Sequence, residues 1–348
     1  MYEKEYLLIS VKHLQNNFSH LYIEKNVESY PLTNLAIESF PKATIIWIDH
    51  YKDIFNRGGQ DFQNQKATMK LILAKKRPPF LYPASDMIQE FGTPNAFYNT
   101  PVLNCLYNCE YCFLQGMYPS GNLVVFANED DLKNAIDMQL NDLNDPLKPT
   151  VVSVSYNTDL LAMENILPLT KSWIKYASTK NNLKIEIRTK SALISAIKNL
   201  NAVDNVILSW TLSPELICER YEYTAPPLDR RIKAVMQAID IGWPVRLCFD
   251  PVLLIDNWYE VYTGFFDQVF SKINVNRVTD VTLGVFRMNK DYFKRIRKRD
   301  TRSDIYYMDY SVEGNTMVVN REERVDALNQ LSLYLNKFIE NKKILVWK

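Results

Sequence analysis

The stretch Cys105-Leu-Tyr-Asn-Cys109-Glu-Tyr-Cys112 holds three of the five cysteines of this 348-residue chain within eight residues. The other two, Cys218 and Cys248, stand far downstream and are not spaced as a second pair. A reducing cytosol keeps thiols from forming disulfides, so the clustering indicates metal binding. Structural zinc takes four ligands, usually in two pairs, whereas this site offers three. We therefore predict a three-thiolate site with one open coordination position. A zinc knuckle lacking a ligand and three unrelated thiols are the alternatives.

The rest of the composition narrows the classes of function. The chain carries 41 Lys+Arg and 40 Asp+Glu, and 47% of its residues are hydrophobic. A dedicated nucleic-acid binder is usually clearly basic, so any DNA contact is expected to be local. The three histidines do not support a Ser-His-Asp triad or a His-rich metal site, because all stand near the N-terminus: His13, His20 and His50. The first residues lack the pattern of a signal peptide and no apolar run approaches a membrane span, which predicts a cytoplasmic protein without membrane contact.

Strand-like runs alternate with amphipathic helices from residue 96 to residue 348, whereas residues 1–95 form a less regular α/β extension. Such alternation is typical of parallel βαβ units. The predicted strands are 101–104, 150–155, 183–189, 205–211, 244–249 and 280–286. The predicted helices are 130–144, 168–178, 191–199, 229–241 and 258–273, and a hairpin and a helix over 322–339 end the chain. About six units predict a partial (β/α)6 TIM-like barrel.

Period-2 alternation places polar side chains on one face of the predicted strands. Arg246, Cys248 and Asp250 share one such face. A barrel interior is ordinarily apolar, so a polar row predicts a cavity for a cofactor and a substrate, with an interior salt-bridge network as the alternative. Barrel active sites form at the carboxyl ends of the strands. These ends carry the cysteine stretch, Thr158-Asp159, Lys190, 209–211, Asp250 and Arg287.

The Cys-x3-Cys-x2-Cys spacing, with the aromatic Tyr111 before the last cysteine, resembles the signature of the radical S-adenosylmethionine (SAM) superfamily. The resemblance implies a [4Fe–4S] cluster on Cys105, Cys109 and Cys112, with one iron left to chelate the amino and carboxylate groups of SAM. Reduction of the cluster by a partner such as flavodoxin or ferredoxin would then cleave SAM to a 5′-deoxyadenosyl radical. In such enzymes the cofactor carries the hard chemistry and the protein positions it.

The segment Cys109-Glu-Tyr-Cys112-Phe-Leu-Gln is similar to the corresponding segment of the spore photoproduct lyase family. Further similarities follow in the same order along the chain: Tyr22-Ile-Glu, Tyr30-Pro31-Leu32, Ser213-Pro-Glu, Arg220-Tyr221-Glu222, Pro226, Leu228 and Arg230-Arg231. In that family the radical abstracts a hydrogen from a methylene-bridged thymine dimer in DNA, which fragments to two thymines. By position, the SAM site would be lined by Thr158, Asp159, Lys190 and Ser209. Lys190 would pair with the SAM carboxylate, and the backbone of Tyr111 would contact the adenine.

The chain departs from the family's pattern in the residues that return hydrogen. The family places a donor cysteine just before its Ser/Thr-Asp pair, where this chain reads Ser155-Tyr-Asn-Thr-Asp159, and it has a relay Tyr in place of Phe113. Cys248 and Tyr156 are the candidates for a replacement donor and a radical quencher, with plain packing as the alternative for each. We therefore expect repair of thymine lesions, with another substrate of the same family as one alternative and a non-catalytic Fe–S or zinc module as another.

The stretch 290–302 is the candidate DNA contact, because it concentrates basic residues directly after Arg287. Its members are Lys290, Lys294, Arg295, Arg297, Lys298, Arg299 and Arg302. Such side chains can neutralise backbone phosphates, although a solvated helix face is the alternative. The hairpin that follows is basic and aromatic in the family, whereas residues 309–315 are acidic here.

Overall fold

The computed structural model describes residues 18–84, 93–142, 147–222, 224–299 and 303–347. Its contacts divide the chain into two compact units. The first comprises Met1–Tyr107, Tyr118–Thr189 and Ser195–Ile207, and the second comprises Asn108–Met117, Lys190–Ile194 and Leu208–Lys348. Within the described ranges, no helix is both long and apolar enough to cross a membrane.

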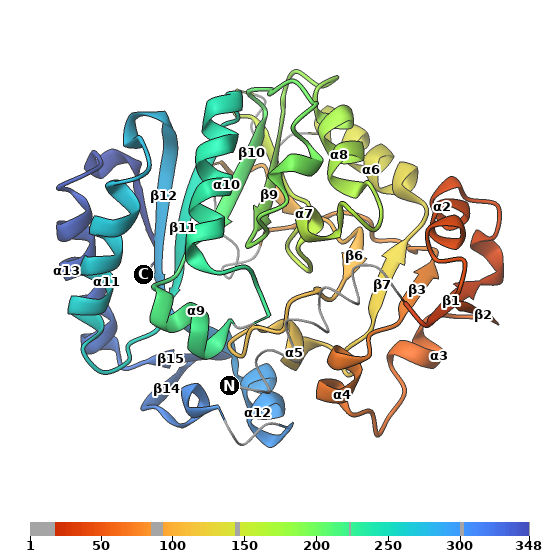
Figure 1. The fold of residues 1–348 in the computed structure, drawn as a ribbon, viewed down its shortest axis with the longest axis horizontal. Coiled ribbons are helices and arrows are strands. Elements are labelled where there is room, and N and C mark those ends of the chain that lie inside the picture. The colour runs from red at the N-terminus through yellow and green to blue at the C-terminus, as the bar shows by residue number, and fades with distance from the viewer. Residues whose placement is uncertain (1–17, 85–92, 143–146, 223, 300–302, 348) are drawn as a thin grey trace. The chain divides into compact units, whose positions relative to one another are not determined.

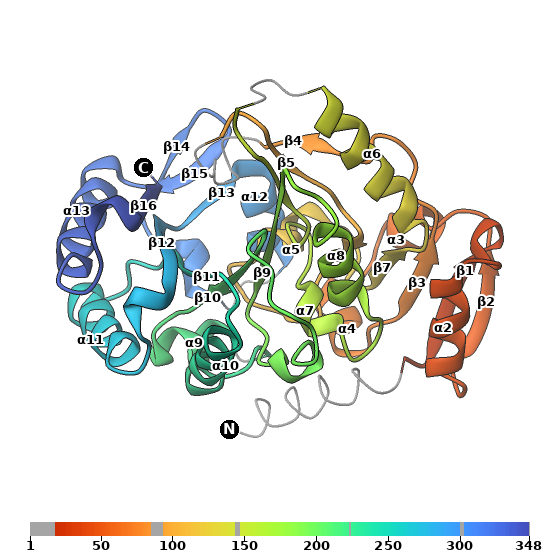
Figure 2. The ribbon, with the colours of Figure 1, turned by 90° about the horizontal axis from the view of Figure 1, so that it is seen from above.

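A five-stranded sheet in the order β2-β1-β3-β7-β6 forms one part of the first unit. Its strands are β1 (His20–Glu24), β2 (Thr44–Ile48), β3 (Leu71–Ala74), β6 (Val102–Leu103) and β7 (Leu123–Phe126). β6 is antiparallel to β7, and the other pairs are parallel. β3 and β7 are buried along their whole length, as parallel strands covered on both faces should be. The helices associated with this sheet are α2 (Pro31–Ser39), which lies against β1 (Figures 1 and 2), α3 (Lys52–Phe55), α4 (Phe62–Ala67) and α6 (Glu129–Asn141).

The first unit also holds the parallel strands β5 (Ala96–Tyr98), β8 (Thr150–Ser153) and β9 (Leu183–Thr189). The short strand β4 (Tyr82–Pro83) adds to β5 in the antiparallel direction. Helices α7 (Leu160–Met163) and α8 (Leu169–Ala177) connect β8 to β9. Both β5 and the strands of the five-stranded sheet therefore belong to this unit, and the boundary at residue 95 stays a prediction.

The second unit continues the alternation with the parallel strands β10 (Val206–Thr211, of which it holds the part from Leu208 on), β11 (Val245–Val252), β12 (Val278–Val285) and β16 (Ile344–Trp347). Its helices are α9 (Glu215–Tyr221), α10 (Leu228–Ile241), α11 (Trp258–Phe270) and α13 (Arg321–Leu335). α10 packs on β11 (Figure 1). It ends at Gly242, whose φ of 103° lies in the left-handed region that glycine adopts without strain. α13 packs on both α11 and β12.

A small antiparallel sheet in the order β13-β15-β14 confirms the predicted hairpin. Its strands are β13 (Arg287–Asn289), β14 (Tyr310–Glu313) and β15 (Thr316–Val319), and α12 (Lys290–Arg299) follows β13 directly. α12 packs on α5 (Leu114–Met117). A Cβ on Gly116 would lie 2.5 Å from the Cα of Tyr292, so only glycine allows the two helices to approach this closely.

The succession of parallel strands and helices confirms the predicted fold class, a partial (β/α) barrel of the TIM type. The parallel strands that alternate with helices or turns along the chain are β5, β8, β9, β10, β11 and β12. The short 3-10 turns η1 (Lys25–Val27), η3 (Val275–Arg277), η4 (Asp304–Tyr307) and η5 (Asn341–Lys343) complete the described elements, with one more named below.

Two predicted elements are wrong. The run 101–104 was expected to be the first barrel strand, but β6 pairs with β7 in the five-stranded sheet, and β5 takes the place beside β8. Residues 191–199 were expected to be a helix and contain only the 3-10 turn η2 (Ile194–Ala196). The carbonyl of Ser191 accepts a hydrogen bond from the Trp210 indole (2.9 Å) and its hydroxyl accepts the N–H of Leu193, so local side-chain bonds replace a helical start.

Candidate cofactor site

The second unit holds the loop that carries two of the three motif cysteines, Asn108–Cys112, hereafter the cysteine loop. The N–H of Cys112 donates to the carbonyl of Cys109 at 3.0 Å, which closes a tight turn. The side-chain amide of Gln115 donates to the same carbonyl at 2.7 Å. Cys109 is buried and Cys112 is half-buried. The turn therefore presents two thiols from one short, hydrogen-bonded segment.

Tyr111, between these cysteines, is held at both ends of its side chain. Its hydroxyl donates to the carboxylate of Glu222, and the ammonium of Lys190 lies 5.3 Å from the centre of its ring. Tyr111 is 6% exposed. The resemblance implied only a backbone contact for Tyr111, and the structure adds a side-chain anchor. Lys190, predicted for the SAM carboxylate, is thus a neighbour of the cysteine loop within the same unit.

Glu222 is the acceptor of a buried polar cluster that sequence reasoning missed. It forms an ion pair with Arg231, with 2.5 Å between Oε2 and Nη2 and no exposure of either side chain. Its Oε1 also accepts the hydroxyl of Ser213 at 2.9 Å. Burial raises the pKa of the Glu222 carboxyl, and the charge of Arg231 opposes this shift. In the sequence, Glu222 and Arg231 were noted only because they lie in segments similar to a family. No local pattern indicated that they form an ion pair.

Cys105, the remaining motif cysteine, lies in the first unit and is half-buried. The N–H of Tyr107 points at its Sγ at 3.4 Å. The ammonium of Lys66 donates to the carbonyls of both Cys105 and Tyr107, the latter at 3.1 Å. Lys66 is only 7% exposed, which is rare for a lysine. A buried cation thus stands beside the backbone of this cysteine, another feature that no sequence pattern indicated.

Asn104 fixes the chain's entry into the motif. Its φ of 76° is left-handed, a conformation that Asn tolerates better than most residues. Its side-chain amide donates to the carbonyls of Ser120 (2.8 Å) and Asn122 (3.1 Å), and its Oδ1 accepts the N–H of Cys105. The backbone before the first cysteine is therefore turned and held by one buried side chain.

The donor chemistry suits an iron–sulfur cluster. All five cysteines lie in the described part of the chain and none is in a disulfide, so the three motif cysteines are in the reduced form that Fe–S ligation requires. Within the same described ranges, no three His, Cys, Asp or Glu side chains converge closely enough to hold a single metal ion. The cluster assignment accordingly rests on the identity and spacing of the three thiols and on the N–H directed at Cys105.

The residues predicted to line the SAM site differ in what they contact. The hydroxyls of Thr158 and Ser209 are buried and have no hydrogen-bond partner among the described residues. Asp159 is engaged: its Oδ1 accepts the N–H of Ala162 (3.0 Å), which caps α7, and the hydroxyl of Thr189 (2.7 Å). A buried hydroxyl without a partner is costly, so Thr158 and Ser209 are each suited to a polar ligand, whereas Asp159 also has a structural task.

The two candidate hydrogen-return residues occupy different environments. Tyr156 is half-buried in the first unit, and its ring centre lies 4.8 Å from that of Tyr98. Cys248 is fully buried in β11 of the second unit, in register with Thr211 on β10 and Thr282 on β12. The thiol of Cys248 therefore shares a row with two hydroxyl side chains of the neighbouring strands.

Part of the polar row is an interior salt-bridge network, as the alternative interpretation held. Arg246, 3% exposed, forms a two-pronged ion pair with Asp280, with 2.8 Å between Nη2 and Oδ2. Asp250 pairs with Arg287 at 3.0 Å. Buried charges need such partners. Asp250 and Arg287 therefore have each other as partners.

The basic stretch 290–302 begins as the helix α12, and its residues 300–302, including Arg302, lie outside the described residues, as does His13. Phe293 and Ile296 are buried, which turns one face of the helix inward. The guanidinium of Arg299 donates to the carbonyl of Gln115, so α12 is tied to α5, immediately after the cysteine loop. The exposed basic side chains of this helix are Lys294, Arg295, Arg297, Lys298 and Arg299.

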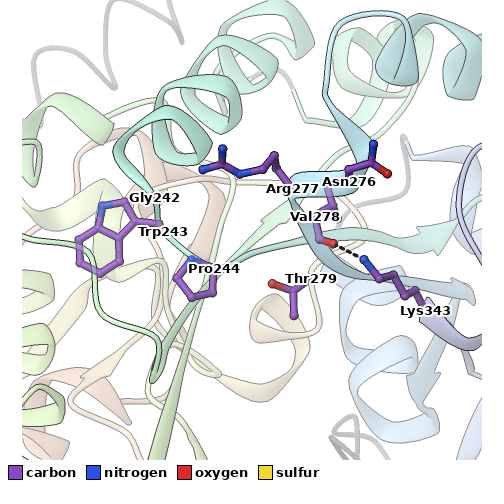
Figure 3. Close-up of a pocket in the computed structure, with 8 residues that line it drawn as sticks. All are labelled: Gly242, Trp243, Pro244, Asn276, Arg277, Val278, Thr279 and Lys343. Carbon is purple, nitrogen blue, oxygen red and sulfur yellow. Dashed lines mark hydrogen bonds between the residues drawn. The ribbon is translucent and has the colours of Figure 1, made fainter.

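A pocket of about 360 Å³ opens in the second unit near the amino ends of β11 and β12 (Figure 3). Arg277 and Lys343 line it, and Lys343 donates to the carbonyl of Val278 at 3.1 Å. Sites in barrels form at the carboxyl ends of the strands. This pocket therefore lies at the wrong ends of these strands to be the predicted SAM site.

Comparisons with known proteins agree on one family. A family model described as spore photoproduct lyase matches residues 19–316. The spore photoproduct lyase of Bacillus subtilis (strain 168) is 20% identical over 352 residues, covering 95% of this chain and 99% of that protein. The enzyme of the same description from Clostridium acetobutylicum is 23% identical over 271 residues, covering 75% of this chain and 76% of that protein.

Solved structures share the fold. A spore photoproduct lyase complexed with dinucleoside spore photoproduct has a TM-score of 0.80 at 16% identity. A double variant with bound AdoMet and dinucleoside spore photoproduct has a TM-score of 0.78 at 17% identity. Each match covers 95% of this chain and 98% of the other. At such identities the likeness establishes the fold, which agrees with the partial barrel described above.

Proposed function

The chain belongs to the spore photoproduct lyase family, and we propose that it is a radical SAM enzyme that returns a methylene-bridged thymine lesion in DNA to two thymines. The observation that carries the proposal is the family match over residues 19–316, which includes the whole cysteine motif. The curated relatives bear the name of that activity. A solved relative binds both AdoMet and the dinucleoside lesion.

In this proposal Cys105, Cys109 and Cys112 hold a [4Fe–4S] cluster. The cluster and SAM, when bound, supply the reductive cleavage that yields a 5′-deoxyadenosyl radical. The chain's own residues fix the ligands. The Gln115 amide and the Lys66 ammonium hold carbonyls of the motif backbone, so the thiols are presented from a segment with few ways to move. Such preorganisation is what a cofactor site requires.

The same chain would bind SAM through side chains of complementary chemistry. Lys190 would pair with the carboxylate, because a charge-assisted hydrogen bond is among the stronger polar contacts. The hydroxyls of Thr158 and Ser209, which lack partners among the described residues, would gain them from the ligand. Asp159 and the backbone of Tyr111 would line the same site, as the family resemblance implies. For the hydrogen-return step, Cys248 and Tyr156 stay the proposed donor and quencher.

The DNA would lie against α12. Its exposed basic side chains can neutralise phosphates, and contacts of this type carry most of the salt-dependent affinity for DNA. Because the chain as a whole is nearly neutral, this local surface would be the main electrostatic attraction. A reducing partner such as flavodoxin or ferredoxin, and a cytoplasmic location, complete the proposal.

A second candidate function is the same radical chemistry on a different substrate. The observation in its favour is that Phe113 and the stretch 155–159 lack the family's relay Tyr and donor Cys. If this candidate holds, SAM cleavage proceeds without conversion of the thymine lesion.

Anaerobic reconstitution tests the radical SAM assignment directly. The protein incubated with iron, sulfide and reductant should gain about four irons and four sulfides per chain and should release 5′-deoxyadenosine from SAM. A Cys109→Ala variant is the matched control and should do neither. Wild-type protein that takes up no cluster, or that leaves SAM intact when reduced, would overturn the assignment in favour of a non-catalytic module.

A further inference from the structure

Within the second unit, three residues of one segment hold the cysteine loop. They are Tyr221, Glu222 and Thr224, hereafter the loop seat. The N–H of Asn108 donates to the hydroxyl of Thr224 at 2.6 Å, and the N–H of Glu110 donates to the carbonyl of Tyr221 at 2.9 Å. Two backbone positions of the loop are thus fixed by residues more than a hundred positions later in the chain. This seating does not depend on any metal ligand.

The third contact of the loop seat is of a different kind, because it is charged. The hydroxyl of Tyr111 donates to Glu222, whose only charged partner among the described residues is the equally buried Arg231. Arg231 is itself fixed to carbonyls of Pro226 (2.6 Å) and Thr211 (3.3 Å). Burying an ion pair is unfavourable unless its geometry is well satisfied. Because the buried carboxylate of Glu222 accepts a hydrogen bond from a hydroxyl of the cysteine loop, its role is to fix the position of that loop.

Tyr111 also contacts Lys190, which is proposed to bind SAM. Its ring, fixed at the hydroxyl end by Glu222, presents a face to the Lys190 ammonium at 5.3 Å. A cation over an aromatic face is attracted by the electron-rich ring. The hydroxyl of Tyr111 thus ties the cysteine loop to Glu222, whereas its ring contacts Lys190. Different substitutions can remove these two contacts separately.

We infer that Glu222, held in place by Arg231, is the positioning residue of the cysteine loop and acts on Cys109 and Cys112 through the hydroxyl of Tyr111. The consequence for catalysis rests on the proposed function, because it assumes that these thiols bind a cluster. The positioning itself does not, and it can be measured on the thiols of the protein without cluster.

Three substitutions separate the tasks. Tyr111→Phe removes the hydroxyl and keeps the ring, Tyr111→Leu removes both, and Glu222→Gln removes the charge from the acceptor. Tyr262→Phe is the matched control, because Tyr262 is another buried tyrosine of the same unit, and its hydroxyl accepts the N–H of Leu253 instead. Each variant is compared with wild type in thermal stability, so that a general loss of folding is recognised.

The first measurement is the alkylation rate of each cysteine in the cluster-free protein, followed by peptide mass spectrometry. We expect Tyr111→Phe to raise the rates at Cys109 and Cys112 by about tenfold, the lower end of the range for one hydrogen bond to a charged group, and to leave the rate at Cys248 unchanged. Tyr262→Phe should leave all three rates at the wild-type value. Equal effects of Tyr111→Phe and Tyr262→Phe, or none from Tyr111→Phe, would overturn the inference.

The second measurement uses the reconstituted protein and records iron loss to a chelator and the Kd for SAM. Tyr111→Phe and Glu222→Gln should speed iron loss, whereas only Tyr111→Leu should also weaken SAM binding. A Tyr111→Phe variant that loses iron at the wild-type rate would contradict the inference. If wild-type protein takes up no cluster, the proposed function fails, but the alkylation rates of Tyr111→Phe still decide whether the bond from the Tyr111 hydroxyl to Glu222 positions the cysteine loop.

Discussion

Lys190 is the residue for which the sequence and the structure both support a proposed contact with SAM. It follows directly after β9, belongs to the second unit, and lies over the ring of Tyr111. Its position after a strand end made it a candidate, and its neighbour in the cysteine motif strengthens that assignment. The proposal that it pairs with the SAM carboxylate follows from the charge and the reach of its side chain.

Replacing Lys190 with Met should weaken SAM binding by about ten- to a hundredfold, the range for one hydrogen bond to a charged group. The Kd of SAM for the reconstituted protein measures this effect. Lys184→Met is the matched control, because Lys184 is exposed on β9, the strand that ends just before Lys190, and its Kd should equal that of wild type. Equal affinities for all three proteins would rule out the carboxylate contact.

Cys248→Ala tests the hydrogen donor. If the buried thiol of Cys248 returns hydrogen to the substrate radical, its loss should shift the products from two thymines toward adducts of the trapped radical. Product analysis by mass spectrometry after anaerobic turnover records this partitioning. An unchanged ratio of products would remove Cys248 from the mechanism and leave Tyr156 as the remaining proposed quencher.

A buried acid that precedes helix α8 caps the start of that helix. The carboxylate of Glu164 accepts the N–H groups of Thr170 (2.7 Å) and Lys171 (3.3 Å), which are otherwise unpaired at a helix start. Burial raises the pKa of Glu164 to about 7, although these hydrogen bonds oppose the shift. Because the folded pKa exceeds the unfolded one, the protonated acid favours the folded state, and this contribution is lost as the pH rises from about 4.5 to 7.

Glu164→Gln should therefore gain stability relative to wild type as the pH rises. The difference in the free energy of unfolding between the two proteins should change by up to roughly 3 kcal/mol over that window. Urea unfolding at a series of pH values measures it. A difference that stays constant with pH would show that Glu164 titrates normally in the folded protein.

Helix α12 allows a test of DNA binding by charge. Its buried Phe293 and Ile296 leave the basic side chains on the outer face. Neutralising Lys294, Arg297 and Lys298 to Gln should weaken DNA binding and lower the slope of log Kd against log salt by about one unit for each phosphate that is no longer neutralised. Binding titrations at several salt concentrations give that slope.

A control triple with the same change in net charge uses the exposed Lys233, Lys272 and Lys342. This variant should keep the wild-type slope. If both triples reduce the slope alike, the attraction is a property of the overall charge and α12 is not the contact surface.

Most of the barrel could be predicted from the sequence, because its strands are locally marked. The alternation in Leu183–Thr189 and the apolar runs of Val206–Thr211 and Val278–Val285 predicted β9, β10 and β12 nearly to the residue. The run 101–104 was misplaced because its apolar character does not say which sheet it joins. Pairing with β7 is decided by packing, and local pattern carries no information on the partner.

The candidate site also contains residues that the sequence predicted and residues that it did not. The three motif cysteines were predicted because their spacing is local. Glu222 and Lys66 were missed as partners of the motif because they contact it across 111 and 39 positions of the chain. A buried carboxylate or ammonium has no sequence signature until its partner is known. Contacts made far along the chain identify the residues that hold the motif in place, whereas the motif itself indicates only the proposed ligands of the cofactor.

Conversion of the lesion itself is the most direct test of the proposed function. The reconstituted, reduced protein is incubated with SAM and a dinucleoside spore photoproduct without oxygen, and the products are separated by chromatography. The account predicts two thymidines per lesion together with 5′-deoxyadenosine in wild type, and neither product in Cys109→Ala. Formation of 5′-deoxyadenosine while the spore photoproduct stays intact would contradict the account and assign this radical chemistry to another substrate.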